Sequence, residues 1–280
     1  MIYSTPKYPN QIRLDTTTAC NAKCLSCHRN TLAARERKGK MDINYAVDII
    51  KDIASWDRPL SELVPVNYGE VFLYPDWFNL LVLVERLLPQ TVIVIPTNGS
   101  LLSQESVACL ARIKTVKILN LSVNALYQET YEQFTGLSFD NYTRLRRIVD
   151  YLHFHRPDIE IVASMVFDPA YQTDLERGEF YLYWKQLVNH VVCLPAANCN
   201  RHEQIIKPIQ PCRSIFSDLA IGYDGKLSAC CFEAGFTMDL GEYKGSVLEA
   251  WRNPKLEQLR ELHNTGKRQE VLQCSKCSFA

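Results

Sequence analysis

Residues 20–27 read Cys-Asn-Ala-Lys-Cys-Leu-Ser-Cys, and this stretch decides how the rest of the sequence is interpreted. Three cysteines within eight residues are too dense to be explained by packing, and they follow a short, strand-like run at 11–15. Three thiolates leave one position of a cuboidal [4Fe–4S] cluster free, whereas ferredoxin sites use four cysteines with other spacings. The C-x3-C-x2-C stretch therefore predicts a metal site, in the loop after a strand, at which a further ligand can bind.

Length and composition favour a metal-dependent protein of the cytoplasm. The 280 residues include 31 basic and 31 acidic side chains, so no net charge draws the chain to nucleic acid or to a membrane. We find neither a signal peptide nor an apolar stretch long enough to cross a bilayer. Eleven cysteines in that compartment indicate metal or redox chemistry. The one dense basic run, Arg35–Lys40, is interpreted as a solvated loop.

The first 195 residues alternate between apolar, β-branched runs and amphipathic runs, a pattern typical of a parallel sheet covered by helices. Six such units are typical of an α/β barrel or partial barrel with its reactive groups at the carboxyl ends of the strands. The expected strands are 11–15, 63–66, 91–95, 116–123, 159–166 and 191–194. The expected helices are 44–53, 77–88, 104–113, 142–154 and 174–188.

A second, smaller module follows. Residues 196–211 show no clear period and are predicted to link the 1–195 barrel to a domain at 212–280. Asp224-Gly225 between two strand-like runs predicts a hairpin, and 246–262 has the spacing of one amphipathic helix. Cys274 and Cys277 form a C-x2-C knuckle. Because so small a module buries little apolar surface, we expect a metal to hold it together.

The cysteine stretch resembles the cluster motif of the radical S-adenosylmethionine (SAM) superfamily. The resemblance implies a partial (β/α)6 TIM barrel in which Cys20, Cys24 and Cys27 hold a [4Fe–4S] cluster whose open iron binds SAM. It also implies a reductant such as flavodoxin or ferredoxin, whose electron cleaves SAM to a 5′-deoxyadenosyl radical. One departure is Ser26, where the family usually has an aromatic residue. The alternatives are free thiols or a zinc knuckle that includes His28.

Three strand ends carry what this resemblance requires for SAM binding. Tyr68, Gly69 and Glu70 follow the second strand and are similar to the family's Gly-Gly-Glu-Pro element, which binds the SAM amino group. Asn98 follows the third strand and is expected to donate to the SAM carboxylate, although Asn-Gly is also a common turn. Ser122 closes the fourth strand and resembles the position that contacts the ribose. The order of these residues after the cysteine motif, each at the end of a predicted strand, indicates SAM binding more strongly than any single residue does.

The C-terminal module resembles the twitch domain, a shortened SPASM domain, of the aminocyclitol dehydrogenases in this superfamily. The resemblance implies a second [4Fe–4S] cluster, with a complete set of four ligands: Cys212, Cys230, Cys274 and Cys277. Cys231 is the alternative to Cys230, which we prefer for its spacing. A four-cysteine zinc site stays open at this point, since both metals accept four thiolates.

Four cysteines are left over. Cys109 and Cys193 lie in predicted apolar elements and are interpreted as packed thiols. Cys199 lies in a predicted loop near the strand ends and Cys231 adjoins a predicted cluster ligand, so these two are the candidates to donate a hydrogen atom to a substrate radical, as a cysteine does in radical SAM epimerases. The polar loop residues that could act as a base are left unranked: Asp168, Arg201, His202 and Glu233.

The resemblance implies a two-cluster enzyme that removes hydrogen from a small polar substrate, such as a sugar or aminocyclitol of natural-product biosynthesis. Loss of a proton and an electron would give dehydrogenation, and quenching by a thiol would give epimerisation. Modification of a ribosomal peptide is the second hypothesis; only nineteen residues precede Cys20, which disfavours a leader-binding domain. A non-catalytic zinc or iron–sulfur protein is the third.

Overall fold

One eight-stranded sheet runs through the protein in the order β6-β5-β4-β3-β2-β1-β7-β8. The computed structural model describes residues 2–196, 210–230, 232–275 and 277. Neighbouring strands are parallel except β7 and β8, which are antiparallel. The strands are β1 (Gln11–Asp15), β2 (Glu62–Val64), β3 (Val92–Thr97), β4 (Val116–Ser122), β5 (Glu160–Phe167), β6 (His190–Pro195), β7 (Asp218–Gly222) and β8 (Leu227–Ser228).

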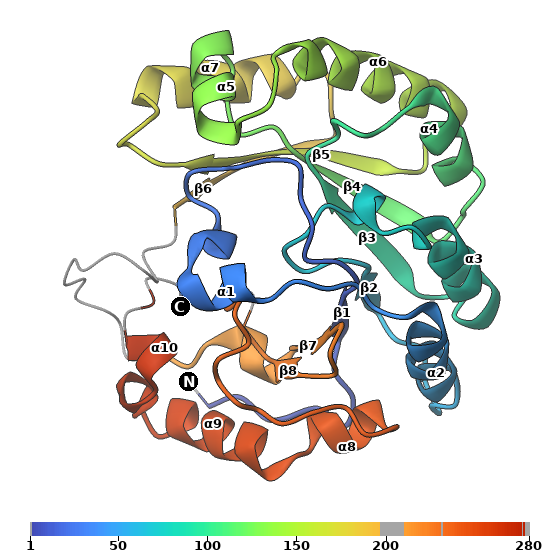
Figure 1. The fold of residues 1–280 in the computed structure, drawn as a ribbon, viewed down its shortest axis with the longest axis vertical. Coiled ribbons are helices and arrows are strands. Elements are labelled where there is room, and N and C mark those ends of the chain that lie inside the picture. Colours follow the sequence, from blue (N-terminus) through green and yellow to red (C-terminus); the bar gives the residue numbers. More distant parts are fainter. Residues whose placement is uncertain (1, 197–209, 231, 276, 278–280) are drawn as a thin grey trace.

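Most helices form an arc around the outer side of this curved sheet, whereas α1 lies on its inner side (Figure 1). The α-helices are α1 (Leu32–Glu36), α2 (Ile43–Ala54), α3 (Trp77–Leu87), α4 (Gln104–Leu110), α5 (Gln128–Thr135), α6 (Asp140–His155), α7 (Asp174–Trp184), α8 (Val247–Trp251), α9 (Pro254–Asn264) and α10 (Leu272–Ser275). Short 3-10 turns are η1 (His28–Asn30), η2 (Val71–Leu73), η3 (Arg213–Phe216) and η4 (Arg268–Glu270).

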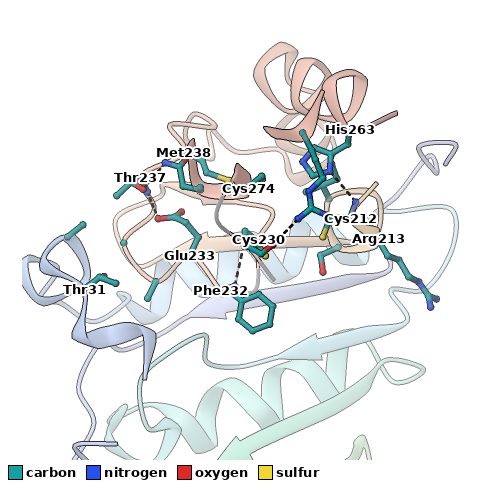
Figure 2. Close-up of a pocket in the computed structure, with 18 residues that line it drawn as sticks. Thr31, Cys212, Arg213, Cys230, Phe232, Glu233, Thr237, Met238, His263 and Cys274 are labelled. Atoms are coloured by element: carbon teal, nitrogen blue, oxygen red, sulfur yellow. Dashed lines mark hydrogen bonds between the residues drawn. The ribbon is translucent and has the colours of Figure 1, made fainter. Parts of the chain in front are cut away.

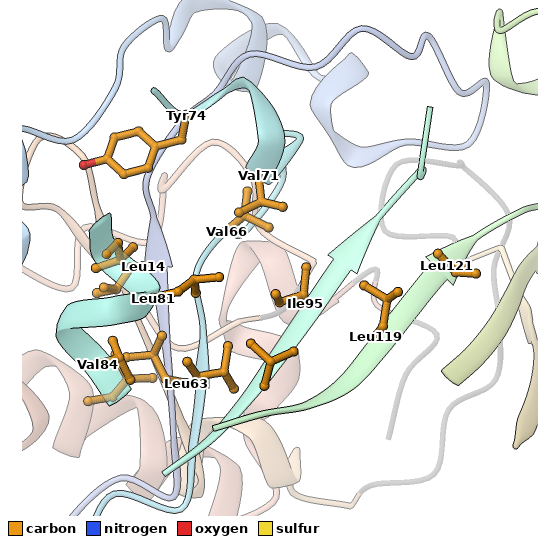
Figure 3. Close-up of a cluster of buried hydrophobic side chains, with 14 of the residues drawn as sticks. Leu14, Leu63, Val66, Val71, Tyr74, Leu81, Val84, Ile95, Leu119 and Leu121 are labelled. Carbon is orange, nitrogen blue, oxygen red and sulfur yellow. The ribbon is translucent and has the colours of Figure 1, made fainter. Parts of the chain in front are cut away.

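The strand and helix order confirms the predicted partial barrel with a small C-terminal hairpin and helices. Apolar side chains of the central strands and of α3 meet in one buried cluster, which includes Leu63, Ile95, Leu81 and Val84 (Figure 3). Because β1 to β6 are all parallel, their carboxyl ends lie at one edge of the sheet. The loops that carry the predicted cluster and SAM residues begin at this edge.

The C-terminal module is an extension of the barrel. Strand β7 pairs in parallel with β1, from Gln11 opposite Asp218 to Asp15 opposite Gly222. Buried side chains of the module, such as Trp251 in α8, belong to the same apolar cluster as those of the barrel strands. The predicted hairpin is present, and Gly225 in its turn has a φ of +83°, which favours glycine. The module is therefore held by shared apolar packing as well as by any metal it binds.

Two details differ from the sequence prediction. The single helix expected at 246–262 is wrong: it is broken into α8 and α9 at Pro254, whose ring cannot continue a helix from the preceding turn but suits the first position of the next one. The side chain of Asn253 caps α9 by accepting a hydrogen bond from the Leu256 N–H at 3.0 Å. Helices α1, α5 and α10 were not predicted.

Most of the predicted 196–211 linker lies outside the described residues, and the two predicted domain boundaries stay predictions. Within the part of the chain that the structure describes, no helix combines the length and the apolar character needed to cross a membrane.

Candidate metal centres and active site

The first cysteine loop follows β1 and brings three partly exposed thiols together: Cys20, Cys24 and Cys27. The Cys27 N–H donates to the Cys24 carbonyl at 3.1 Å, which turns the loop back on itself. Burial, together with the charges of Cys27 and Cys20, raises the pKa of the Cys24 thiol to about 12. A bound cationic metal would stabilise the thiolate forms of all three side chains, which otherwise repel one another. The loop thus fits an iron–sulfur cluster.

Helix α5, which the sequence did not predict, anchors this loop. The N–H groups of Lys23 and Leu25 donate to the carbonyls of Thr135 and Phe134 at 2.7 and 2.9 Å. These carbonyls belong to the last turn of α5, where no partner exists within the helix. The side-chain amide of Asn30 also donates to the Cys24 carbonyl at 2.9 Å. The backbone of the loop is therefore held independently of its sulfur atoms.

Ser26, the departure from the family pattern, connects the cysteine loop to the loop that follows β5. Its hydroxyl donates to the Asp168 carboxylate at 2.6 Å, and Asp168 is fully buried just after β5. The Asp168 N–H donates to the Gln172 side chain at 2.6 Å, and the Gln172 amide donates to the Asn124 carbonyl after β4. Asp168 was among the possible bases, but its carboxylate here has a positioning role for the loop.

Replacing Ser26 by alanine should lower the free energy of unfolding by about 1–3 kcal/mol, because a buried carboxylate loses a hydrogen-bond donor. Urea unfolding of the apoprotein measures this loss. Ser26→Thr keeps the hydroxyl and is the matched control. A Ser26→Ala protein as stable as the Ser26→Thr protein would show that the bond to Asp168 contributes nothing.

Gly69 and Glu70 lie in the loop between β2 and η2, next to the cysteine loop. A Cβ atom on Gly69 would be 2.0 Å from the Thr17 carbonyl oxygen, so only glycine allows this approach. The Glu70 N–H donates to the Ala19 carbonyl at 2.8 Å. The Glu70 carboxylate is 1% exposed and accepts from the Thr97 hydroxyl at 2.7 Å and the Asn98 N–H at 2.8 Å. Glu70 therefore holds the turn after β3 in place beside the loop.

Substitution of Gly69 by alanine is expected to destabilise the protein by about 1–3 kcal/mol or more, because the backbone around Thr17 must move away. The internal control is Gly178→Ala in α7, where an added Cβ meets nothing within 4 Å. That change should stabilise by about 0.5–1 kcal/mol, since alanine favours helix. Thermal and urea unfolding give both values, and equal effects at the two positions would contradict the steric argument.

Asn98 lies against the cysteine loop. Its side-chain amide donates to the side-chain Oδ1 of Asn21 at 3.0 Å and lies 3.9 Å from the Cys20 sulfur, while its own Oδ1 accepts from the Ser100 N–H at 2.9 Å. Ser122 lies further along the same edge, half-buried, and its carbonyl accepts from Asn124 at 3.3 Å. The sequence prediction that both contact SAM stays a prediction.

An aromatic row links this edge to the C-terminal module. The His28 ring lies 6.0 Å from the Tyr68 ring and 5.2 Å from the Phe232 ring, measured between centroids. Burial lowers the pKa of His28. Thr31 and Ala33, just beyond His28, line a cavity in the C-terminal module. The first cysteine loop is thus a direct neighbour of the second cysteine set.

That cavity, of about 310 Å³, brings together the four cysteines predicted to bind the second cluster: Cys212, Cys230, Cys274 and Cys277. Figure 2 shows three of them, Cys212, Cys230 and Cys274, with Glu233 and His263 around the same space. Four thiols fit an iron–sulfur cluster or zinc. Among the described side chains, no three metal-binding groups already form a metal site, so binding would draw the thiols closer together. Cys231 and Cys199 fall outside the described residues.

His263 and Arg268 also line this cavity, and the sequence analysis missed both. The Cys212 N–H donates to His263 Nδ1 at 3.1 Å, and burial, helped by Arg268, lowers the pKa of His263 to about 4. The buried Arg268 guanidinium donates to the Cys277 carbonyl at 3.4 Å. A neutral imidazole and a cation next to the thiols suit an anionic cluster. Helical spacing could have indicated that His263 is buried, because it shares the buried face of α9 with Leu256 and Leu259.

Comparison with known proteins gives two family matches. The model of the radical SAM superfamily matches residues 14–181, and the SPASM model, an iron–sulfur cluster-binding domain, matches residues 212–278. No curated protein sequence matches.

Several solved structures share the fold. The structure of BtrN in complex with AdoMet and 2-DOIA is 16% identical and has a TM-score of 0.67, covering 99% of this chain and 94% of BtrN. Streptococcus suis SuiB bound to the precursor peptide SuiA is 16% identical, with a TM-score of 0.71 and coverage of 91% and 67%. Native anSMEcpe with bound AdoMet is 14% identical, with a TM-score of 0.71 and coverage of 95% and 89%.

Proposed function

The chain belongs to the radical SAM superfamily and carries an iron–sulfur-binding SPASM domain, and we propose that it dehydrogenates a small polar substrate of the sugar or aminocyclitol type. Its cofactors are SAM, a [4Fe–4S] cluster in the radical SAM domain and further iron–sulfur binding in the SPASM domain. When bound, the first cluster and SAM supply a 5′-deoxyadenosyl radical. The observation that carries the proposal is the adjacency of the two cysteine sets across His28 and Phe232.

Different residues of this chain would hold the first cluster and SAM. Cys20, Cys24 and Cys27 would hold the first cluster, on a loop fixed by α5 and by Ser26. Glu70, already bonded to Thr97 and to the Asn98 N–H, would position Asn98 beside SAM. The remaining SAM contacts, from Tyr68, Gly69 and Ser122, are proposed on the family resemblance and on their place at the strand ends.

In the proposed oxidation, removal of a hydrogen atom from a substrate C–H bond is the chemistry that SAM and the cluster held by Cys20, Cys24 and Cys27 would supply. The substrate carbon then loses one electron, its hydroxyl loses a proton, and a C=O bond forms. Cys212, Cys230, Cys274 and Cys277 would hold the group that takes this electron. Complete ligation by four thiols favours electron transfer over substrate binding, and the buried Arg268 cation favours acceptance of a negative charge. Epimerisation, with Cys199 or Cys231 as hydrogen donor, is the alternative outcome.

The test is anaerobic reconstitution of the full chain, with iron and sulfide counted and 5′-deoxyadenosine measured after addition of dithionite and SAM. We expect about eight irons per chain and SAM cleavage. Turnover of aminocyclitols, amino sugars and peptides in heavy water then separates the substrate classes, and solvent deuterium in the product carbon indicates epimerisation. Zinc in place of iron, or no cleavage by the fully loaded protein, would contradict the proposal.

A further inference from the structure

A cavity beside the first cysteine loop has a strongly basic lining. Its walls include Cys20, Arg29, Arg35, Arg37, Lys38 and Lys40, and no acidic residue is among the residues that line it. The chain as a whole has no net charge, so this concentration of one sign is local. The sequence predicts a solvated loop for the run from Arg35 to Lys40. In the structure, residues of this run line a cavity that Cys20 also lines.

One of the five cations has a structural role. The Arg37 guanidinium donates to Asp15 and to Asp224, both at 3.2 Å, and it lies 4.0 Å from the centre of the Phe236 ring. Since Asp15 ends β1 and Asp224 is in the hairpin turn, Arg37 links the barrel to the C-terminal module. Its charge is compensated within the protein.

The other four cations are not compensated in this way. Within the described part of the chain, Arg29, Arg35, Lys38 and Lys40 form no ion pair. Three of them, Arg35, Lys38 and Lys40, are exposed. Arg29 follows Cys27 by two residues and lines the same cavity as Cys20, so its charge lies beside the predicted cluster site. An unpaired, exposed basic surface attracts acidic partners over several ångströms.

We propose that this surface is the docking site for an acidic one-electron carrier protein of the flavodoxin or ferredoxin class. The inference rests on the proposed function, since it presumes a cluster at Cys20, Cys24 and Cys27. The carrier loses one electron and the cluster gains one, with no bond made or broken. Because Cys20 borders the cavity, a carrier bound there lies next to the cluster. Exposed cations spread over a rim suit a broad acidic protein surface better than one small buried anion.

The test uses the reconstituted full chain with Lys38→Glu and Lys40→Glu combined. We expect the dissociation constant for flavodoxin, measured by calorimetry at low salt, to rise at least about tenfold, with a weaker dependence on salt. SAM cleavage driven by reduced flavodoxin should slow by a similar factor, whereas cleavage driven by dithionite should be unchanged. The matched control is Lys51→Glu with Lys185→Glu, exposed lysines on α2 and after α7 that do not line the cavity.

Each other outcome overturns the docking site. An equal loss of SAM cleavage with dithionite and with reduced flavodoxin would mean that the cavity binds a small anionic cofactor or substrate. Unchanged flavodoxin binding would place the carrier elsewhere, and an equal effect of the Lys51 and Lys185 control would reduce the result to overall charge. Failure of the radical chemistry on which the proposed function rests looks different, because the unmodified protein would then not cleave SAM even with dithionite.

Discussion

Replacement of Cys24 by alanine is expected to abolish SAM cleavage and to lower the bound iron from about eight to about four per chain. Loss of one of only three thiolates leaves a [4Fe–4S] cluster with two protein ligands, which is too few to hold it at the position where SAM binds. The change acts on the sulfur alone. The Cys24 carbonyl, which accepts from Asn30 and from the Cys27 N–H, is still present, so the loop should keep its course.

Iron and sulfide analysis, electron paramagnetic resonance of the reduced protein and chromatography of 5′-deoxyadenosine measure these effects. Cys109→Ala, in α4, is the control, and it should retain both the iron and the cleavage. If the Cys24→Ala protein still cleaves SAM, the first cluster is bound by other residues. If both proteins bind zinc and no iron, the loop is a zinc knuckle.

The barrel could be predicted because its signals are local. Apolar strands such as Val92–Thr97 and amphipathic helices such as Ile43–Ala54 carry their period in their own residues. Helix α5 carries little of this signal, since most of its side chains are polar and only Tyr131, Phe134 and Thr135 are buried. Its importance comes from the two carbonyls that accept from the cysteine loop, which is a contact between distant segments.

In the candidate site, too, the sequence showed which residues are present but not the contacts between distant segments. The motif placed Glu70 in the loop after the second strand, but the sequence could not show that its carboxylate accepts hydrogen bonds from the Thr97 hydroxyl and the Asn98 N–H. The basic run at 35–40 was visible, yet its arrangement around Cys20 depends on how the loop folds back. The cysteine spacing indicated a second metal site, but the shared core and the pairing of β7 with β1 are long-range features.

Replacement of Cys230 by alanine should remove about four irons per chain and abolish substrate oxidation, while SAM cleavage by the first cluster continues. Cys230 lines the cavity of the second set, and the Phe232 N–H donates to its sulfur at 3.4 Å. Cys231→Ala is the matched control, because it removes the neighbouring thiol and should keep about eight irons. Iron analysis, 5′-deoxyadenosine formation and ketone detection with an aminocyclitol substrate separate the two proteins.

This separation depends on the barrel surviving the loss of the second cluster, and the structure indicates that it does. Strand β7 stays paired with β1, and Trp251, Leu256 and Leu219 stay in the common apolar core, none of which requires a metal. We therefore expect the Cys230→Ala protein to unfold cooperatively, with a lowered midpoint in thermal denaturation. Continued ketone formation would instead make the second cluster a structural support, and loss of iron in Cys231→Ala alone would make Cys231 the ligand. Loss of SAM cleavage in a folded Cys230→Ala protein would show that the two clusters do not act separately.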